Sequence, residues 1–118
     1  MFKLNIANGA TIDDIDYDVI KEAKDIRASL LSSDGIAKSG SKAVKVQAIV
    51  ILSSGFLAAW VEASHFCLTQ LKLEDDVVKM AYSFGGTVVS NYSAPTNELV
   101  DAYNKSVIFG DIVGWINV

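Results

Sequence analysis

An apolar, uncharged stretch from Val46 to Val61 constrains the fold of this chain more than any other feature of its sequence. Lys45 and Glu62 bound the stretch, and Ser53-Ser54-Gly55 is its main polar interruption. A helix that crosses a bilayer needs about 20 apolar residues, whereas shorter apolar runs are typical of buried core elements. We therefore expect this stretch to form the centre of a compact core, and we expect no membrane span.

The length and the N-terminal sequence predict a single cytoplasmic domain. A chain of 118 residues has the size of one domain, which would cover residues 1–118. Residues 1–6 carry one positive charge and no sustained apolar region, so no secretory signal is predicted. The single cysteine cannot form an internal disulfide, which is typical of proteins from reducing compartments.

Segment 12–30 carries the clearest helical pattern. Its apolar residues recur at steps of three and four, which places them on one helix face: Ile12, Ile15, Val19, Ala23, Ile26 and Leu30. Thr11 followed by Asp14 resembles a capping box at the start of this helix. We expect the helix to end near Ser32–Gly35 and a loop to continue to Ser41.

The segment from Lys42 to Leu71 can be interpreted as a strand or as a helix. Apolar residues alternate with polar ones at its start, and β-branched residues are common over 43–52, as in a strand. The apolar pattern nevertheless continues to Leu71, with its main break at Ser53-Ser54-Gly55. One long buried helix that is kinked at this tripeptide accounts for both halves, and we prefer this interpretation.

Two more helices are expected in the C-terminal half. The acidic residues 74–76 are typical of a first helical turn, and apolar residues from Val77 to Tyr92 follow at helical spacing. Another helix is predicted around Leu99–Val107. The tail, 111–118, fits a short helix or a strand that pairs with the N-terminus.

Together these patterns predict a mostly α fold, a single-domain bundle of four to five helices around a long central apolar helix. The alternative is an α+β fold with short strands at 2–7, 43–52 and 111–118. A single proline and few hairpin-turn signals argue against an all-β domain, which needs a turn every 8–12 residues or so.

The charges of the chain favour a protein partner over a nucleic acid. A net charge of −4 argues against direct binding to nucleic acid, which depends on Lys and Arg. Six acidic residues crowd the first predicted helix: Asp13, Asp14, Asp16, Asp18, Glu22 and Asp25. We interpret this acidic face as a docking surface for a basic partner, including a nucleic-acid-binding protein.

The chain has more aromatic residues than one small core requires. Tyr, Trp and Phe are enriched at the centres of protein interfaces. We therefore expect a homo-oligomer, most simply a twofold dimer, with an interface formed by Trp60, Tyr92, Tyr103, Phe109 and Trp115.

Pairs of metal-ligating residues at helical spacing suggest a second class of function. Glu62 with His65, and Glu98 with Asp101, would each project from one side of a helix, as metal-binding pairs do in helical enzymes. These four residues are the candidate ligands of a metal-dependent all-α hydrolase. No complete phosphate-loop, calcium-loop or catalytic motif is present, and we expect no cofactor.

The sequence thus favours a non-catalytic protein-binding module that self-associates and docks on a partner protein. An adaptor, a small acidic inhibitor or a structural subunit would act in this way. The metal-dependent hydrolase is the alternative.

Overall fold

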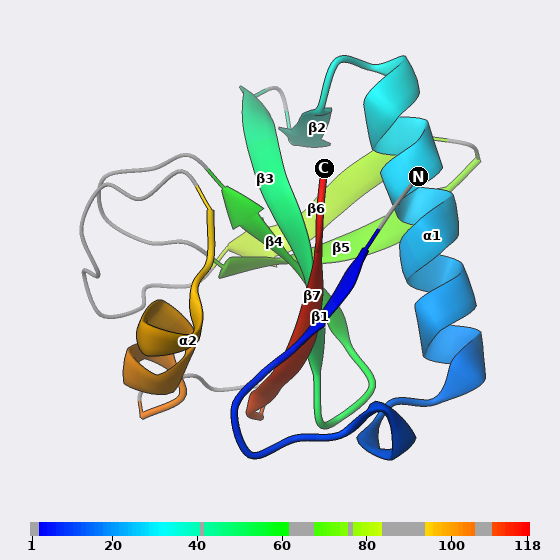
Figure 1. Ribbon diagram of the computed structural model, residues 1–118. Coiled ribbons are helices and arrows are strands. Elements are labelled where there is room, and N and C mark those ends of the chain that lie inside the picture. The colour runs from blue at the N-terminus through cyan, green and yellow to red at the C-terminus, as the bar shows by residue number, and fades with distance from the viewer. Residues whose placement is uncertain (1–2, 41, 62–67, 76, 84–93, 106–109) are drawn as a thin grey trace.

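The computed structural model describes residues 3–40, 42–61, 68–75, 77–83, 94–105 and 110–118. Within these ranges the chain forms a sheet of seven strands, two α-helices and one 3-10 turn (Figure 1). In chain order the elements are β1 (Leu4–Ile6), η1 (Ile12–Asp14), α1 (Tyr17–Ser32), β2 (Ile36–Ser39), β3 (Lys42–Leu52), β4 (Leu57–Val61), β5 (Leu68–Glu74), β6 (Val77–Ser83), α2 (Asn97–Tyr103) and β7 (Ile112–Asn117).

The sheet curls back on itself around the long strand β3. Its strand order is β1-β7-β3-β2-β6-β5-β4, and β4 pairs with β3 as well. The first part of β3 pairs with β2, and its second part pairs with β4 on one side and β7 on the other. All of these pairings are antiparallel except the short parallel contact between β2 and β6. The last strand of the chain therefore lies between the first strand and the central one.

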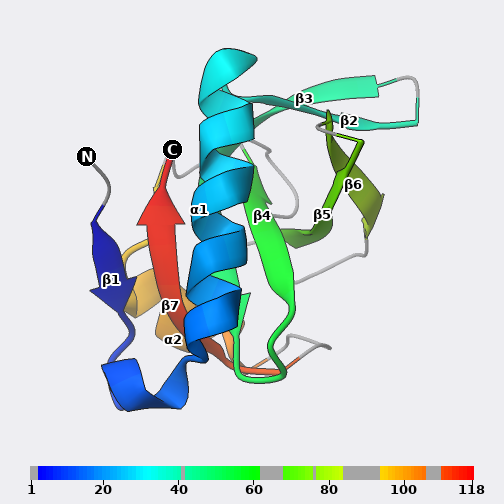
Figure 2. The ribbon, with the colours of Figure 1, turned by 90° about the vertical axis from the view of Figure 1, so that its right-hand side faces the viewer.

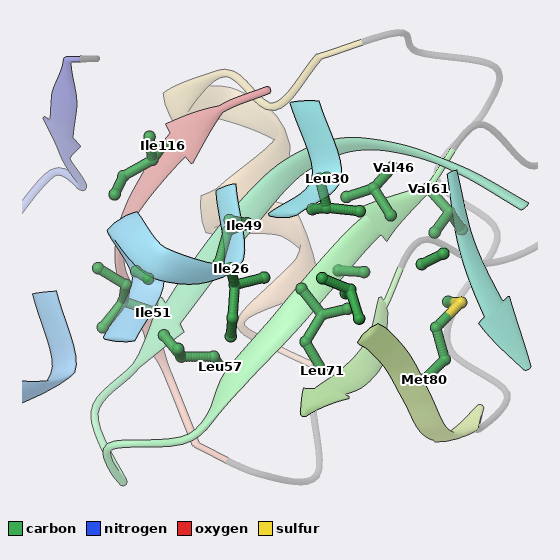
Figure 3. Close-up of a cluster of buried hydrophobic side chains, with 14 of the residues drawn as sticks. Ile26, Leu30, Val46, Ile49, Ile51, Leu57, Val61, Leu71, Met80 and Ile116 are labelled. Carbon is green, nitrogen blue, oxygen red and sulfur yellow. The ribbon is translucent and has the colours of Figure 1, made fainter. Parts of the chain in front are cut away.

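Helices cover both faces of the central strands (Figure 2). Helix α1 lies across one face, and its buried residues Ala23, Ile26 and Leu30 meet the sheet there. Figure 3 shows this core, in which Ile26 and Leu30 lie among side chains from β3, β4, β5, β6 and β7. On the other face, α2 contributes Leu99, Val100 and Tyr103 to a second core. The central strands are consequently buried from both sides.

Strand β3 shows how one sequence supplies two cores. Ile49 and Ile51 point into the core beneath α1, while Ala48 and Val50 point into the core beneath α2. Val46 also belongs to the α1 core, because the register with β4 shifts between Val46 and Ala48 and changes the phase of the alternation. All five residues of β4 are buried.

The predicted long central helix is wrong, because its described residues form the hairpin β3–β4 and the start of β5. Ser53-Ser54-Gly55 is the turn of this hairpin, and Gly55 has a left-handed φ of 87°. Strands that are buried on both faces read as continuous apolar runs, which periodicity cannot distinguish from a buried helix. The interpretation as a mostly helical bundle of four to five helices therefore fails, and the fold is mostly β.

The helix predicted from residue 74 is also wrong. Val77–Ser83 form strand β6, and Asp75, in the turn before it, has a left-handed φ of 52°. Residues 84–92 of the predicted helix fall outside the described residues. Turns in this chain use Gly and Asp at positive φ instead of proline, as Asp34 and Gly40 also show. The scarcity of proline was for this reason a poor argument against a β fold. The expected loop before Ser41 likewise contains strand β2.

Other local predictions are confirmed. Helix α1 ends at Ser32, and the Thr11–Asp14 capping box is present, although it closes the separate turn η1. The predicted helix around Leu99 is α2, which begins after its cap residue Thr96. The C-terminal tail forms β7, which pairs with β1. In the part of the chain that the structure describes, no helix has the length and apolar character needed to cross a membrane.

Candidate docking site at the N-terminal end of α1

A groove lies between the N-terminal end of α1 and the β3–β4 turn, with a volume of about 370 Å³. We call it the acidic groove. It is lined by Asp13, Asp14, Ile15, Asp16, Tyr17, Val19, Ile51, Leu52, Ser53, Ser54 and Gly55. Figure 1 shows η1 and the β3–β4 turn at the same end of the molecule.

Local structure fixes one wall of the groove. The backbone N–H of Thr11 donates to the carboxylate of Asp14 over 2.7 Å, which closes the turn η1. Ile15 is buried in the α1 core and anchors the chain between η1 and α1. Asp16 is the N-cap residue of α1, and its carbonyl accepts from the N–H of Ile20 over 3.1 Å.

The opposite wall is the β3–β4 turn, which the chain fixes through Ser53. The Ser53 N–H donates to the carbonyl of Asp111 over 2.7 Å, and the Ser53 hydroxyl accepts from the N–H of Asp111 over 3.2 Å. These bonds tie the turn to the start of β7. Ser53 therefore has a structural role, and its hydroxyl is already engaged.

The groove is negatively charged. Asp13, Asp14 and Asp16 line it, Asp18 follows in the first turn of α1, and all four residues are exposed. No Lys or Arg is among the lining residues. The positive end of the helix dipole offsets part of this charge, since the carboxylates lie at the N-terminus of α1.

Exposed apolar side chains accompany these carboxylates. Tyr17 lines the groove and is 74% exposed, while Ile12 and Phe56, next to the lining residues in sequence, are 52% and 48% exposed. Tyrosine is among the residues that most often dominate binding energy at interfaces. These apolar positions and the β3–β4 turn were not predicted as part of a site. The turn was expected inside a helix, although Ser-Ser-Gly between two apolar runs was a signal for it.

The structure divides the six acidic residues that the sequence singled out. Asp13, Asp14, Asp16 and Asp18 gather at one end of α1. Glu22 and Asp25 are exposed farther along the helix, where Lys21 and Lys24 alternate with them in sequence. The charge of the helix is hence partly balanced along its length and unbalanced at its N-terminal end.

Three of the five aromatic residues expected at an oligomer interface lie in the core of the chain. Trp60, Tyr103 and Trp115 are 0%, 0% and 5% exposed in the core beneath α2. The rings of Trp60 and Tyr103 are tilted against each other with centroids 5.9 Å apart. Tyr92 and Phe109 fall outside the described residues. Because the first three fill the interior of one chain, an interface between copies would have to use other residues.

The candidate metal ligands are not brought together by the described part of the chain. Glu98 and Asp101 are exposed on α2, whereas Glu62 and His65 lie outside the described residues. Among the residues that the structure describes, no three His, Cys, Asp or Glu side chains are placed to hold a metal ion.

Comparison of the chain with protein-family models, with curated proteins and with solved structures gives no match in any of the three.

Proposed function

We propose that the chain is a non-catalytic protein-binding module that docks through the acidic groove onto a basic surface of a partner protein. The observation that carries the proposal is the combination of four exposed carboxylates with an exposed Tyr17 at one end of α1. Lys or Arg side chains of the partner would neutralise the carboxylates, and an apolar side chain would cover the tyrosine ring. Carboxylates of this kind speed up the encounter of oppositely charged surfaces and select among partners.

A basic peptide that contains one aromatic residue is a direct probe of this site. We expect the triple variant Asp13→Asn, Asp16→Asn, Asp18→Asn to bind the peptide at least about threefold more weakly, because each exposed ion pair contributes about 0.2–1 kcal/mol. Titration calorimetry at low ionic strength would measure the difference, and added salt should weaken binding to the wild type.

The matched control is Glu98→Gln with Asp101→Asn, which removes exposed carboxylates from α2 at a distance from the groove. This variant should bind the peptide as the wild type does. Equal weakening by both variants would mean that the peptide responds to net charge alone, and the proposed docking site would then be wrong.

A further inference from the structure

Three lysines form a row across the solvent-exposed face of β2, β6 and β5. Their positive charge is opposite to the negative charge of the acidic groove. The strand register places Lys72 of β5 directly opposite Lys79 of β6, and Lys79 directly opposite Lys38 of β2. All three side chains are exposed. Neighbouring strands are about 4.8 Å apart, and like charges directly opposite each other destabilise a sheet. We call this feature the lysine row.

The surroundings of the lysine row are also positive and partly apolar. Lys45 of β3 pairs in register with Ile36 of β2, next to the row on the same face. Ile36 and Val77 are 37% and 45% exposed there. Glu74 also lies on this face, where the register pairs it with Val77. Within the described part of the chain, none of the row's lysines forms an ion pair.

The lysine row and the acidic groove lie at opposite ends of α1. The groove is at the N-terminal end of the helix. Strand β2, which carries Lys38, follows the C-terminal end, and Figure 2 shows β2 beside that end of α1. A helix of 16 residues is about 24 Å long. Exposed charges are screened over about 8 Å at physiological ionic strength, so the two surfaces cannot neutralise each other within one chain.

We infer that the lysine row of one copy binds the acidic groove of a second copy, head to tail. This inference rests on the proposed function, because it names the partner of the groove as another molecule of this chain. In this contact the four carboxylates of the groove would pair with the three lysines of the row and Lys45. The ring of Tyr17 would pack on the exposed side chains of Ile36 and Val77. Charge and apolar surface thus match on both sides of the contact.

A single head-to-tail contact leaves one groove and one lysine row of the pair unoccupied. A head-to-tail interface therefore continues into a closed ring or an open chain instead of stopping at a twofold dimer. Because the contact depends on exposed charges, it should weaken strongly as salt is added.

Reciprocal charge reversal tests the inference by sedimentation velocity at low ionic strength. The first variant carries Asp13→Lys and Asp16→Lys, and the second carries Lys72→Glu and Lys79→Glu. The wild type should form species larger than a dimer, and each variant alone should be monomeric. An equimolar mixture of the two should associate again, since each then offers the surface that the other lacks. The control Glu98→Lys with Asp101→Lys should associate like the wild type.

Circular dichroism establishes that each variant is folded, and Asp13→Asn with Asp16→Asn replaces the first variant if reversal unfolds it. A monomeric wild type that still binds the basic peptide at the groove would overturn the inference and leave the proposed function standing. A monomer that binds no basic peptide would overturn both. If the wild type is monomeric and Lys72→Glu with Lys79→Glu abolishes binding to a DNA duplex, the lysine row serves a polyanion and the inference is wrong.

Discussion

Trp60 lies at the centre of the core between the sheet and α2, and its removal tests whether this core exists as described. The side chain is 0% exposed on β4, and its ring meets that of Tyr103 from α2. The sequence had suggested the opposite location, an interface between copies. Trp60→Ala therefore separates the two possibilities, because a core residue stabilises the folded chain and an interface residue stabilises the oligomer.

The structure sets the magnitude of this effect. A buried tryptophan removes about 150–250 Å² from water. At about 25 cal/mol per Å², the loss is roughly 4–6 kcal/mol, which agrees with the 3–5 kcal/mol or so that Trp→Ala changes cost in protein cores. A domain of this size is stable by only about 5–15 kcal/mol, so the variant should lose much of its stability.

Urea unfolding followed by circular dichroism would measure this loss. The melting temperature should fall by about 12–20 °C, at roughly 4 °C per kcal/mol. Tyr17→Ala is the matched control, since Tyr17 is 74% exposed and its removal should change stability by less than about 0.5 kcal/mol. Trp60→Phe removes an indole N–H that finds no acceptor in the described part of the chain, so this change should cost much less than Trp60→Ala.

Two results would refute the placement of Trp60. A cost below about 1 kcal/mol for Trp60→Ala would mean that the side chain is not buried in a packed core. A variant that keeps its melting temperature but changes its sedimentation coefficient would instead place Trp60 at an interface between copies.

Three further substitutions test single contacts, each by urea unfolding. Gly114→Ala should cost about 1–3 kcal/mol, because a Cβ there would lie 2.8 Å from the backbone carbonyl oxygen of Asn5; an unchanged midpoint would mean that β1 does not pack there. Asn104→Ala should cost about 1–3 kcal/mol because the Asn104 side chain accepts from the N–H of Ile112 over 2.8 Å, whereas Asn104→Asp keeps this acceptor and should cost less. Thr96→Ala should cost about 0.5–2 kcal/mol through loss of the N-cap bond in α2, and Thr96→Ser should retain most of it.

The candidate site was predictable in part. The acidic residues near the start of α1 were visible in the sequence because they are close together along the chain. The other wall of the groove could not be predicted, because it is formed by Ser53 and its neighbours in the turn of the β3–β4 hairpin. The sequence pattern had indicated one helix in place of these two strands. The lysine row could not be predicted from the sequence either. Lys38 is far along the chain from Lys72 and Lys79, and only the strand register aligns the three residues.

The sequence by itself determined the structures that depend on neighbouring residues. The apolar stripe of α1 and the capping residue Thr11 act within a few positions along the chain, so their patterns predicted where α1 and η1 lie. It also determined that Ala48–Leu52 and Leu57–Val61 would be buried, because the hydrophobic effect depends on apolar area and has no direction.

Only the tertiary structure decided that this buried run is a hairpin. The choice depends on hydrogen bonds to partners far along the chain, such as the pairing of Ile49 with Ile116, and on α2, which covers the second face of β3 and β4. A strand that is covered on both faces loses the polar alternation that would identify it. The same long-range register decided which charges share a surface, because strand pairing aligns residues that the sequence keeps apart.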